Sequence, residues 1–166
     1  MWSSHVKTGA ELTISSISAT ALAKEFGTPA FIMDEADFRE RASAWNTALA
    51  NAFGSNTGTV YYAAKAFICV EVARWIKDLG IGIDVCTGGE LAVALKGGID
   101  PAKIEVHGNN KSVVEIEKAV SVGVGTIVID SLYEIERVAA AATKHGVVQK
   151  VLLRLTPGIE AHTHES

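Results

Sequence analysis

From residue 59 onward, short apolar runs alternate with amphipathic stretches along the chain. The runs predict strands, because they are rich in β-branched and aromatic residues and are bounded by turn-forming residues. They are TVYYAAKA (59–66), GIDVC (82–86), KIEVHG (103–108), TIVID (126–130) and KVLLRLTP (150–157). Helical spacing of apolar residues marks the intervening segments 70–79, 88–96, 112–122 and 132–145. The strands begin about 22 residues apart, a spacing typical of repeated βα units.

Two architectures fit this repeat: an open doubly wound sheet, and the first part of a (β/α)8 barrel. Runs such as IVI and VLL are apolar on both faces, which favours buried parallel strands. The Gly-rich phosphate fingerprint of a dinucleotide-binding fold does not follow the first strand. The chain also stops at Ser166 with nothing to close the sheet. We therefore predict an α/β fold in which residues 59–166 form the first five βα strands of an incomplete (β/α)8 TIM barrel.

The first 58 residues follow a different pattern. Residues 1–17 are polar and irregular, which predicts a flexible lead-in. Residues 18–58 predict a helix–strand–helix segment, whose first helix begins at Ser18 and ends at Gly27. The apolar run AFIM (30–33) predicts the short strand of this segment.

A second helix is predicted to begin at Asp34, where acidic residues favour a helix N-terminus. Apolar residues recur along it at helical spacing, at Phe38, Ala42, Trp45 and Leu49. This spacing places them on one face, which we expect to be buried.

The composition fits a globular protein, since 48% of the residues are apolar and 20% are charged. The net charge of −4 argues against a nucleic-acid partner, and no Lys/Arg cluster compensates for it. No segment has the length and apolarity needed to cross a membrane. Cys69 and Cys86 lack a C-x-x-C spacing, so we expect two reduced thiols in a cytoplasmic protein.

Polar side chains follow each predicted strand, at the end where a barrel has its active site. They include Lys65, Asp84, His107, Asn109, Asp130, Arg154, Glu160, His162, His164 and Glu165. Lys65 is notable because it lies among alanines and apolar residues. A lysine amine that is made nucleophilic can bond to a carbonyl carbon, and pyridoxal phosphate is the usual cofactor attached in this way. The alternative is a rim lysine whose ammonium reaches water, and the residues alone leave both open.

Several segments together resemble one enzyme family. They are YYAAKAF (61–67), DVCTGGEL (84–91), HGNNKS (107–112), IVIDS (127–131) and RLTPGIEAHTHE (154–165). In this order and spacing they resemble the diaminopimelate decarboxylases, which are alanine-racemase-like, fold-type III pyridoxal-phosphate enzymes. The lysine element is shared with alanine racemases and with arginine and ornithine decarboxylases, whereas HGNNKS and GIEAHTHE are more specific.

The resemblance implies roles for three residues. Lys65 would be the catalytic lysine that bonds to pyridoxal phosphate and afterwards helps to return a proton to the substrate carbon. Asp84 and Arg154 would bind the cofactor, with Arg154 near its phenolic oxygen. The alternative for Asp84 is a cap of the following helix. The alternative for Arg154 is an ion pair with Asp84 or Asp130, which does not exclude the cofactor role.

Three further residues could belong to the pocket: Glu90, His107 and Asn109. Glu90 matches an acidic position of related decarboxylases, although a solvated helix face is slightly favoured. His107 and Asn109 end the third strand, where a turn histidine is the favoured interpretation. His162 and His164 form an H-x-H pair, but no further ligands accompany them, so no metal site is predicted.

The implied reaction is the pyridoxal-phosphate-dependent decarboxylation of meso-2,6-diaminopimelate to L-lysine and CO2, the last step of lysine biosynthesis. The family acts on this small amino-acid substrate as a homodimer. Its phosphate-binding glycines and its C-terminal β-domain, which AFIM (30–33) joins, would lie beyond Ser166. We therefore expect a fragment that is inactive alone. Two alternatives are another fold-type III decarboxylase or racemase, and a non-catalytic pyridoxal-phosphate-binding homeostasis protein.

Overall fold

A computed structural model of the chain describes residues 6–7, 11–55 and 57–158. The contacts divide the chain into two compact units. The first comprises Met1–Val60 with Asp78–Ile81, and the second comprises Tyr61–Lys77 with Gly82–Ser166. Each unit contains a sheet of its own.

The first unit begins with a small antiparallel sheet of two-residue strands. These are β1 (Val6–Lys7), β2 (Thr13–Ile14) and β3 (Ile17–Ser18). Ser15 and Ser16 link β2 to β3 with positive φ angles of 46° and 66°. Residues 13–18 thus have regular structure where the sequence predicts an irregular lead-in, because the serine turn lets neighbouring residues pair.

Two helices follow in the first unit, α1 (Ala19–Phe26) and α2 (Glu35–Phe53). Both begin where the sequence predicts, because Ser18 and Asp34 accept hydrogen bonds from backbone amides of the first turn. Gly27 ends α1 and Gly54 ends α2.

Two predictions for this unit are wrong. Residues 30–33 belong to no strand, and Phe31 is 99% exposed. No residue of α2 is buried, and Trp45 on the predicted buried face is 69% exposed. Both predictions require a partner surface, since a strand needs a hydrogen-bonded neighbour and an apolar face needs a cover. The apolar pattern identifies such a face but does not supply its partner.

The second unit contains a parallel sheet of five strands. They are β4 (Tyr61–Ala63), β5 (Gly82–Val85), β6 (Ile104–Val106), β7 (Thr126–Ile129) and β8 (Val151–Leu153). Each strand pairs with the next one in the chain, so the strand order never reverses. A doubly wound sheet reverses its order, whereas consecutive right-handed crossovers place every helix on one face, as in a barrel. The prediction of a partial (β/α)8 barrel is confirmed.

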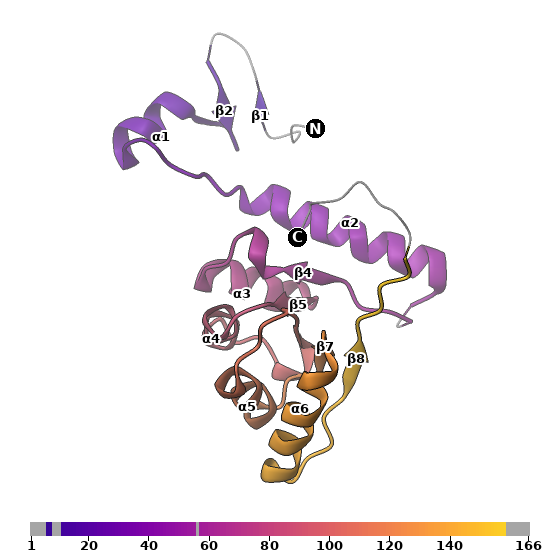
Figure 1. Cartoon of the computed structure of the whole chain (residues 1–166). Coiled ribbons are helices and arrows are strands. Elements are labelled where there is room, and N and C mark those ends of the chain that lie inside the picture. The colour runs from indigo at the N-terminus through magenta and orange to yellow at the C-terminus, as the bar shows by residue number, and fades with distance from the viewer. Residues whose placement is uncertain (1–5, 8–10, 56, 159–166) are drawn as a thin grey trace. The chain divides into compact units, whose positions relative to one another are not determined.

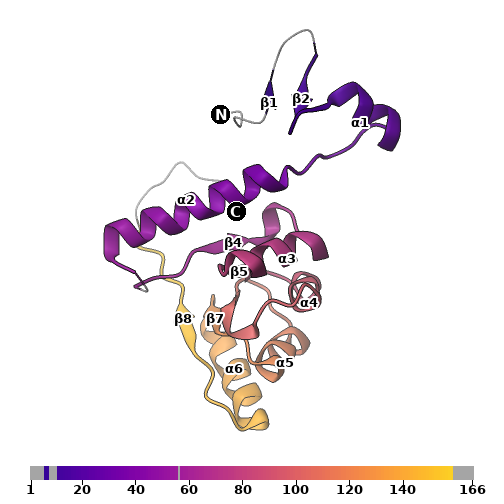
Figure 2. The same cartoon turned by 180° about the vertical axis from the view of Figure 1, so that it is seen from behind.

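The helices of this unit are α3 (Val70–Leu79), α4 (Gly88–Lys96), α5 (Val113–Val122) and α6 (Leu132–His145), with short 3-10 turns η1 (Ala64–Ala66) and η2 (Pro101–Lys103). Three of these helices have the predicted ranges, and α5 begins one residue later than predicted because Ser112 is its N-cap. In both views, α3, α4 and α5 lie along one side of the unit and β8 lies at the opposite margin (Figures 1 and 2). Gly123 and Gly146 end α5 and α6 in the left-handed conformation that favours glycine.

The main core lies between this sheet and its helices. Alternate strand residues point to the helices, and they are almost all aliphatic: Ile83, Val85, Ile104, Val106, Ile127 and Ile129. Buried helix residues include Val72, Ile76, Leu91, Ile116, Val120 and Val138. Within the described part of the chain, no helix is long and apolar enough to span a membrane.

Candidate active site

Because the strands are parallel and adjacent, their C-terminal ends meet at one edge of the sheet. Lys65 lies at this edge in η1, directly after β4, and its side chain is exposed. The Tyr62 hydroxyl donates a hydrogen bond of 2.7 Å to the Phe67 carbonyl and so closes the turn that carries Lys65. Ala64, beside the lysine, is 2% exposed. The position of Lys65 is as predicted, but its amine reaches solvent rather than a closed apolar pocket.

Asp84 lies on the neighbouring strand β5, in register with Ala63 of β4. Its side chain is 17% exposed, and its Oδ1 atom is buried without a hydrogen-bond partner. Burial raises the pKa of Asp84, and the charges of His107 and Lys65 oppose that rise. Asp84 does not cap α4. The cap is Thr87, whose Oγ1 accepts a hydrogen bond from the backbone amide of Glu90.

A glutamate and a histidine complete the polar surface beside Asp84. Glu105 lies in register with Asp84 on the next strand, so the two carboxylates lie side by side on the same face of the sheet. His107 lies near both, with Nε2 at 2.6 Å from Glu105 Oε1 and at 3.7 Å from Asp84 Oδ1. An imidazolium at this position would offset the repulsion between the carboxylates. His107 directly follows β6, and its ring is held by Glu105 of that strand, an arrangement compatible with the turn histidine that the sequence favours.

Arg154 directly follows β8 and is paired with Asp130 at the end of β7. The Arg154 guanidinium donates a hydrogen bond of 2.9 Å to Asp130 Oδ1. The Arg154 amide continues the sheet by bonding to the Ile129 carbonyl at 3.0 Å. Of the two anions considered from the sequence, Asp130 is the one that pairs with Arg154. The arginine side chain is 64% exposed, so it remains open to a further anion.

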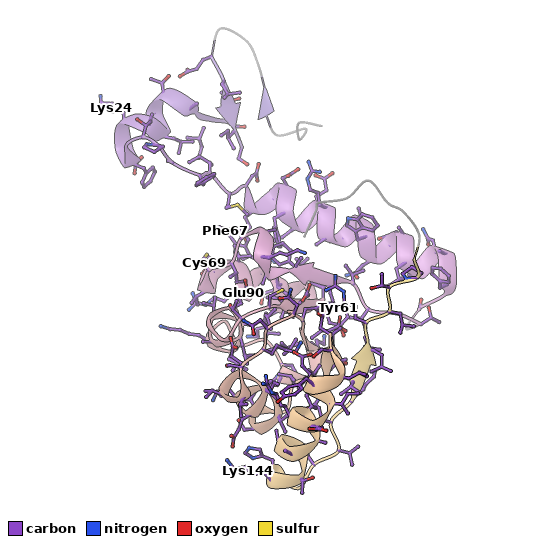
Figure 3. All side chains as sticks on the ribbon, in the orientation of Figure 1. Lys24, Tyr61, Phe67, Cys69, Glu90 and Lys144 are labelled. Atoms are coloured by element: carbon purple, nitrogen blue, oxygen red, sulfur yellow. The ribbon has the colours of Figure 1, made fainter. Side chains whose placement is uncertain are left out.

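Glu90 and Asn109 have different surroundings. Glu90 Oε2 accepts a hydrogen bond of 2.6 Å from the Cys86 amide, so Glu90 holds the loop after β5 and does not lie on a solvated helix face. Figure 3 labels Glu90 within the second unit. Asn109 is exposed in the loop after β6. The residues Glu160, His162, His164 and Glu165 lie outside the described part of the chain.

The chemistry of this edge fits pyridoxal phosphate. The Lys65 amine can bond to an aldehyde carbon. The buried, unpartnered Oδ1 of Asp84 is an acceptor available for a cationic donor. The exposed guanidinium of Arg154 can bind an anionic oxygen.

Sequence reasoning missed Glu115 and Glu134 at this edge, although a repeated pattern that also includes Glu90 marks them. Each of three helices begins with Ser/Thr-x-x-Glu, the spacing of a capping box. The repeats begin at Thr87, Ser112 and Ser131 and end at Glu90, Glu115 and Glu134. A further residue of this edge, Lys111, carries no local pattern, and its burial is visible only in the fold.

Glu115 connects two of the helices. Its carboxylate accepts hydrogen bonds from the Ser112 amide at 2.9 Å and from the amide of Gly88, the first residue of α4, at 2.8 Å. These backbone donors hold the pKa of Glu115 below its ordinary value.

Comparisons with known proteins place the chain in one family. The profile described as "Pyridoxal-dependent decarboxylase, pyridoxal binding domain" matches residues 35–166. The chain is 58% identical over 152 residues to a diaminopimelate decarboxylase of Mycobacterium tuberculosis, covering 92% of this chain and 33% of that protein. It is 40% identical to the enzyme of that name from Halalkalibacterium halodurans, covering 98% of this chain and 36% of that protein.

A solved structure agrees with these relatives. The crystal structure of diaminopimelate decarboxylase from M. jannaschii in co-complex with L-lysine has a TM-score of 0.83 at 27% identity. It covers 95% of this chain and 37% of that one. The chain thus spans about a third of the length of the curated relatives it matches. With the profile match over residues 35–166 and the partial barrel, the chain belongs to the pyridoxal-binding domain family of the pyridoxal-dependent decarboxylases.

Proposed function

We propose that this chain forms the N-terminal part of an enzyme that decarboxylates meso-2,6-diaminopimelate to L-lysine and CO2. The observation that carries the proposal is the position of Lys65, at the strand-end edge that also holds Asp84 and Arg154. The relatives with 58% and 40% identity, both diaminopimelate decarboxylases, support the substrate assignment.

In this proposal, three side chains of the edge hold the cofactor. Lys65 would bond to it covalently, Asp84 would accept a hydrogen bond from a cationic donor, and Arg154 would bind an anionic oxygen. When bound, pyridoxal phosphate supplies an electron sink for the electron pair released as CO2 departs. The Lys65 amine, once free, can carry a proton to the substrate carbon. Glu90, His107 and Asn109 are proposed as further members of the pocket.

We extend the proposal to the assembly. By its resemblance to the family, the full-length protein is a cytoplasmic homodimer that takes a small amino-acid substrate. "Full-length protein" here means a protein that carries this segment at the length of its relatives. Size-exclusion chromatography with light scattering tests the dimer, and a monomer at working concentration would contradict it.

The cofactor role of Lys65 is tested by chemical labelling. The full-length protein is loaded with pyridoxal phosphate, reduced with borohydride and digested, and the labelled peptide is identified by mass spectrometry. The label is expected on Lys65 and is expected to vanish in Lys65→Ala, with Lys96→Ala as the matched control. A label on another lysine would contradict the proposal.

Substrate choice is tested separately. The full-length protein is assayed for CO2 release from meso-2,6-diaminopimelate, L-lysine, L-ornithine and L-arginine. Release from meso-2,6-diaminopimelate alone is expected. Release mainly from another member of the panel would favour a different decarboxylase of the same fold type.

A further inference from the structure

A buried ion pair lies at the same edge of the sheet as Lys65. Lys111, in the loop after β6, contacts Glu134, in the first turn of α6, with Nζ at 3.0 Å from Oε2. Their side chains are 2% and 4% exposed. None of the proposed cofactor-binding roles uses either residue.

Stability alone does not account for this pair. Moving two charges out of water is costly, and well-packed apolar side chains in their place are often as stable or more so. The pair is therefore better explained by what its two members hold.

Each member also holds the backbone of a site loop. Lys111 Nζ donates a hydrogen bond to the Gly108 carbonyl, next to His107. Glu134 Oε2 accepts a hydrogen bond of 2.9 Å from the amide of Asp130, whose carboxylate binds Arg154. Gly108 itself has a φ of +103°, and a Cβ there would lie 3.0 Å from the Cys86 carbonyl oxygen, so this loop has little freedom to shift.

The other two helices of this edge provide a comparison. Glu90 and Glu115 occupy the same helical position as Glu134, and each also binds loop amides. Among these three glutamates, only Glu134 has a lysine ion pair in the described contacts. The lysine thus joins the loop after β6 to the end of β7, a connection that the glutamate alone would not make.

We propose that Lys111 and Glu134 are positioning residues for the cofactor site, an inference that rests on the function proposed above. Their ion pair fixes the Gly108 carbonyl and the Asp130 amide. It thereby keeps His107, and Arg154 through Asp130, at the edge where Lys65 lies.

The test uses two variants of the full-length protein. Glu134→Gln removes one charge, and Lys111→Met/Glu134→Leu removes both charges and both backbone contacts. The single variant is expected to lower the melting temperature, because it leaves the lysine buried and unpaired. The double variant is expected to regain most of that loss, since no buried charge remains.

Cofactor measurements separate positioning from stability. In the double variant we expect pyridoxal-phosphate affinity and kcat to fall by about tenfold or more, the size typical for residues that orient a directly contacting group. The circular dichroism of bound pyridoxal phosphate, recorded at saturation and well below the melting temperature, is expected to change as well. A merely structural role predicts that affinity, kcat and this signal return to wild-type values together with stability, and that result would overturn the proposal.

The exposed pair Lys144–Glu117 is the matched control. It joins α5 to α6, the helix that carries Glu134, but its side chains are 65% and 35% exposed. Figure 3 labels Lys144 near the C-terminal end of α6. Lys144→Met/Glu117→Leu is expected to leave cofactor affinity and the dichroism unchanged. A wild-type protein that carries no borohydride-fixed label at Lys65 would instead refute the proposed function, so the two failures are distinguishable.

Discussion

The two faces of the β4–β8 sheet are built from the same strands but carry different chemistry. The face toward the helices presents aliphatic residues such as Ile83, Ile104 and Ile127, all 1% exposed or less. The opposite face presents Asp84 and Glu105 in register with one another. The first face stabilises the fold by burying apolar area. The second holds charged groups that are costly to bury, and such groups are typical of functional sites.

The largest expected effect concerns β8, the outermost strand of the sheet. In the described chain β8 pairs on one side only, and its residue Leu152 is 47% exposed. An exposed apolar edge strand is prone to pair with other chains. We therefore expect the 166-residue segment, purified alone, to associate in light scattering. Leu152→Lys should raise the monomer fraction, whereas Val148→Lys, outside the strand, should not; a cooperative monomeric melt of the segment would contradict the prediction.

The helix-facing side of the sheet should be the more sensitive to truncation. Ile127 is 0% exposed in the centre of that face. In the full-length protein Ile127→Ala should lower the free energy of unfolding by about 2–5 kcal/mol, through lost burial and the cavity left behind. Urea unfolding measures this change. A loss equal to that of the exposed control Val114→Ala would show that this face is not a packed core.

On the opposite face, a glycine sets how closely an aromatic ring can approach the sheet. A Cβ on Gly82 would lie 2.6 Å from the Tyr61 ring and 3.0 Å from the Lys103 carbonyl oxygen. Gly82→Ala should therefore cost about 1–3 kcal/mol of unfolding free energy, the usual range for overpacking. Tyr61→Ala/Gly82→Ala should recover part of this loss. Additive losses in the double variant would show that the ring is not the obstacle.

A smaller, pH-dependent effect is expected at Asp84. Burial raises its pKa above the ordinary 3.8, so the folded protein binds this proton more tightly than the unfolded chain does. The stability that Asp84 contributes is therefore present below the ordinary pKa and is lost as pH rises through the raised value. Asp84→Asn should melt at a higher temperature than wild type at neutral pH, and the difference should vanish in acid.

The control for Asp84 lies on the same face. Asp130 forms an ion pair with Arg154, so Asp130→Asn should show no gain in melting temperature at neutral pH. A higher melting temperature for both variants would indicate general relief of negative charge rather than burial of Asp84.

The smallest effect on stability is expected at the proposed catalytic lysine. Lys65 is exposed, so Lys65→Ala should change the free energy of unfolding by no more than about 0.5 kcal/mol. Measured without pyridoxal phosphate, its urea midpoint should match that of wild type. A large loss would mean that Lys65 serves the fold, and it would weaken the contrast between the two faces.

The parts of the molecule also differ in how well they could be predicted from the sequence. The ranges of α3, α4 and α6 follow from local apolar spacing and are confirmed. The positions of Lys65 and Asp84 at one edge follow from the βα repeat. The exposure of Trp45 and the missing strand at 30–33 could not be predicted, because both depend on a partner surface that local spacing does not reveal.

The polar contacts of the edge were predicted less well. The ion pair between Arg154 and Asp130 was among the alternatives, since a guanidinium near a buried strand needs an anion. The contacts Glu105–His107 and Lys111–Glu134 were not foreseen. The first joins residues two positions apart, a spacing that places both side chains on one face of extended chain but does not reveal a contact. The second joins residues 23 positions apart, which is beyond the reach of helical or strand periodicity.

The carboxylate of Glu115 serves two successive βα units, because it binds Ser112 in its own helix cap and Gly88 at the start of α4. Units that share such a contact are not independent modules. In chimaeras made from relatives of this family, the segment from β5 to the start of α5 should be exchanged as one block. A crossover between Gly88 and Glu115 would pair a glutamate from one parent with a loop shaped by the other.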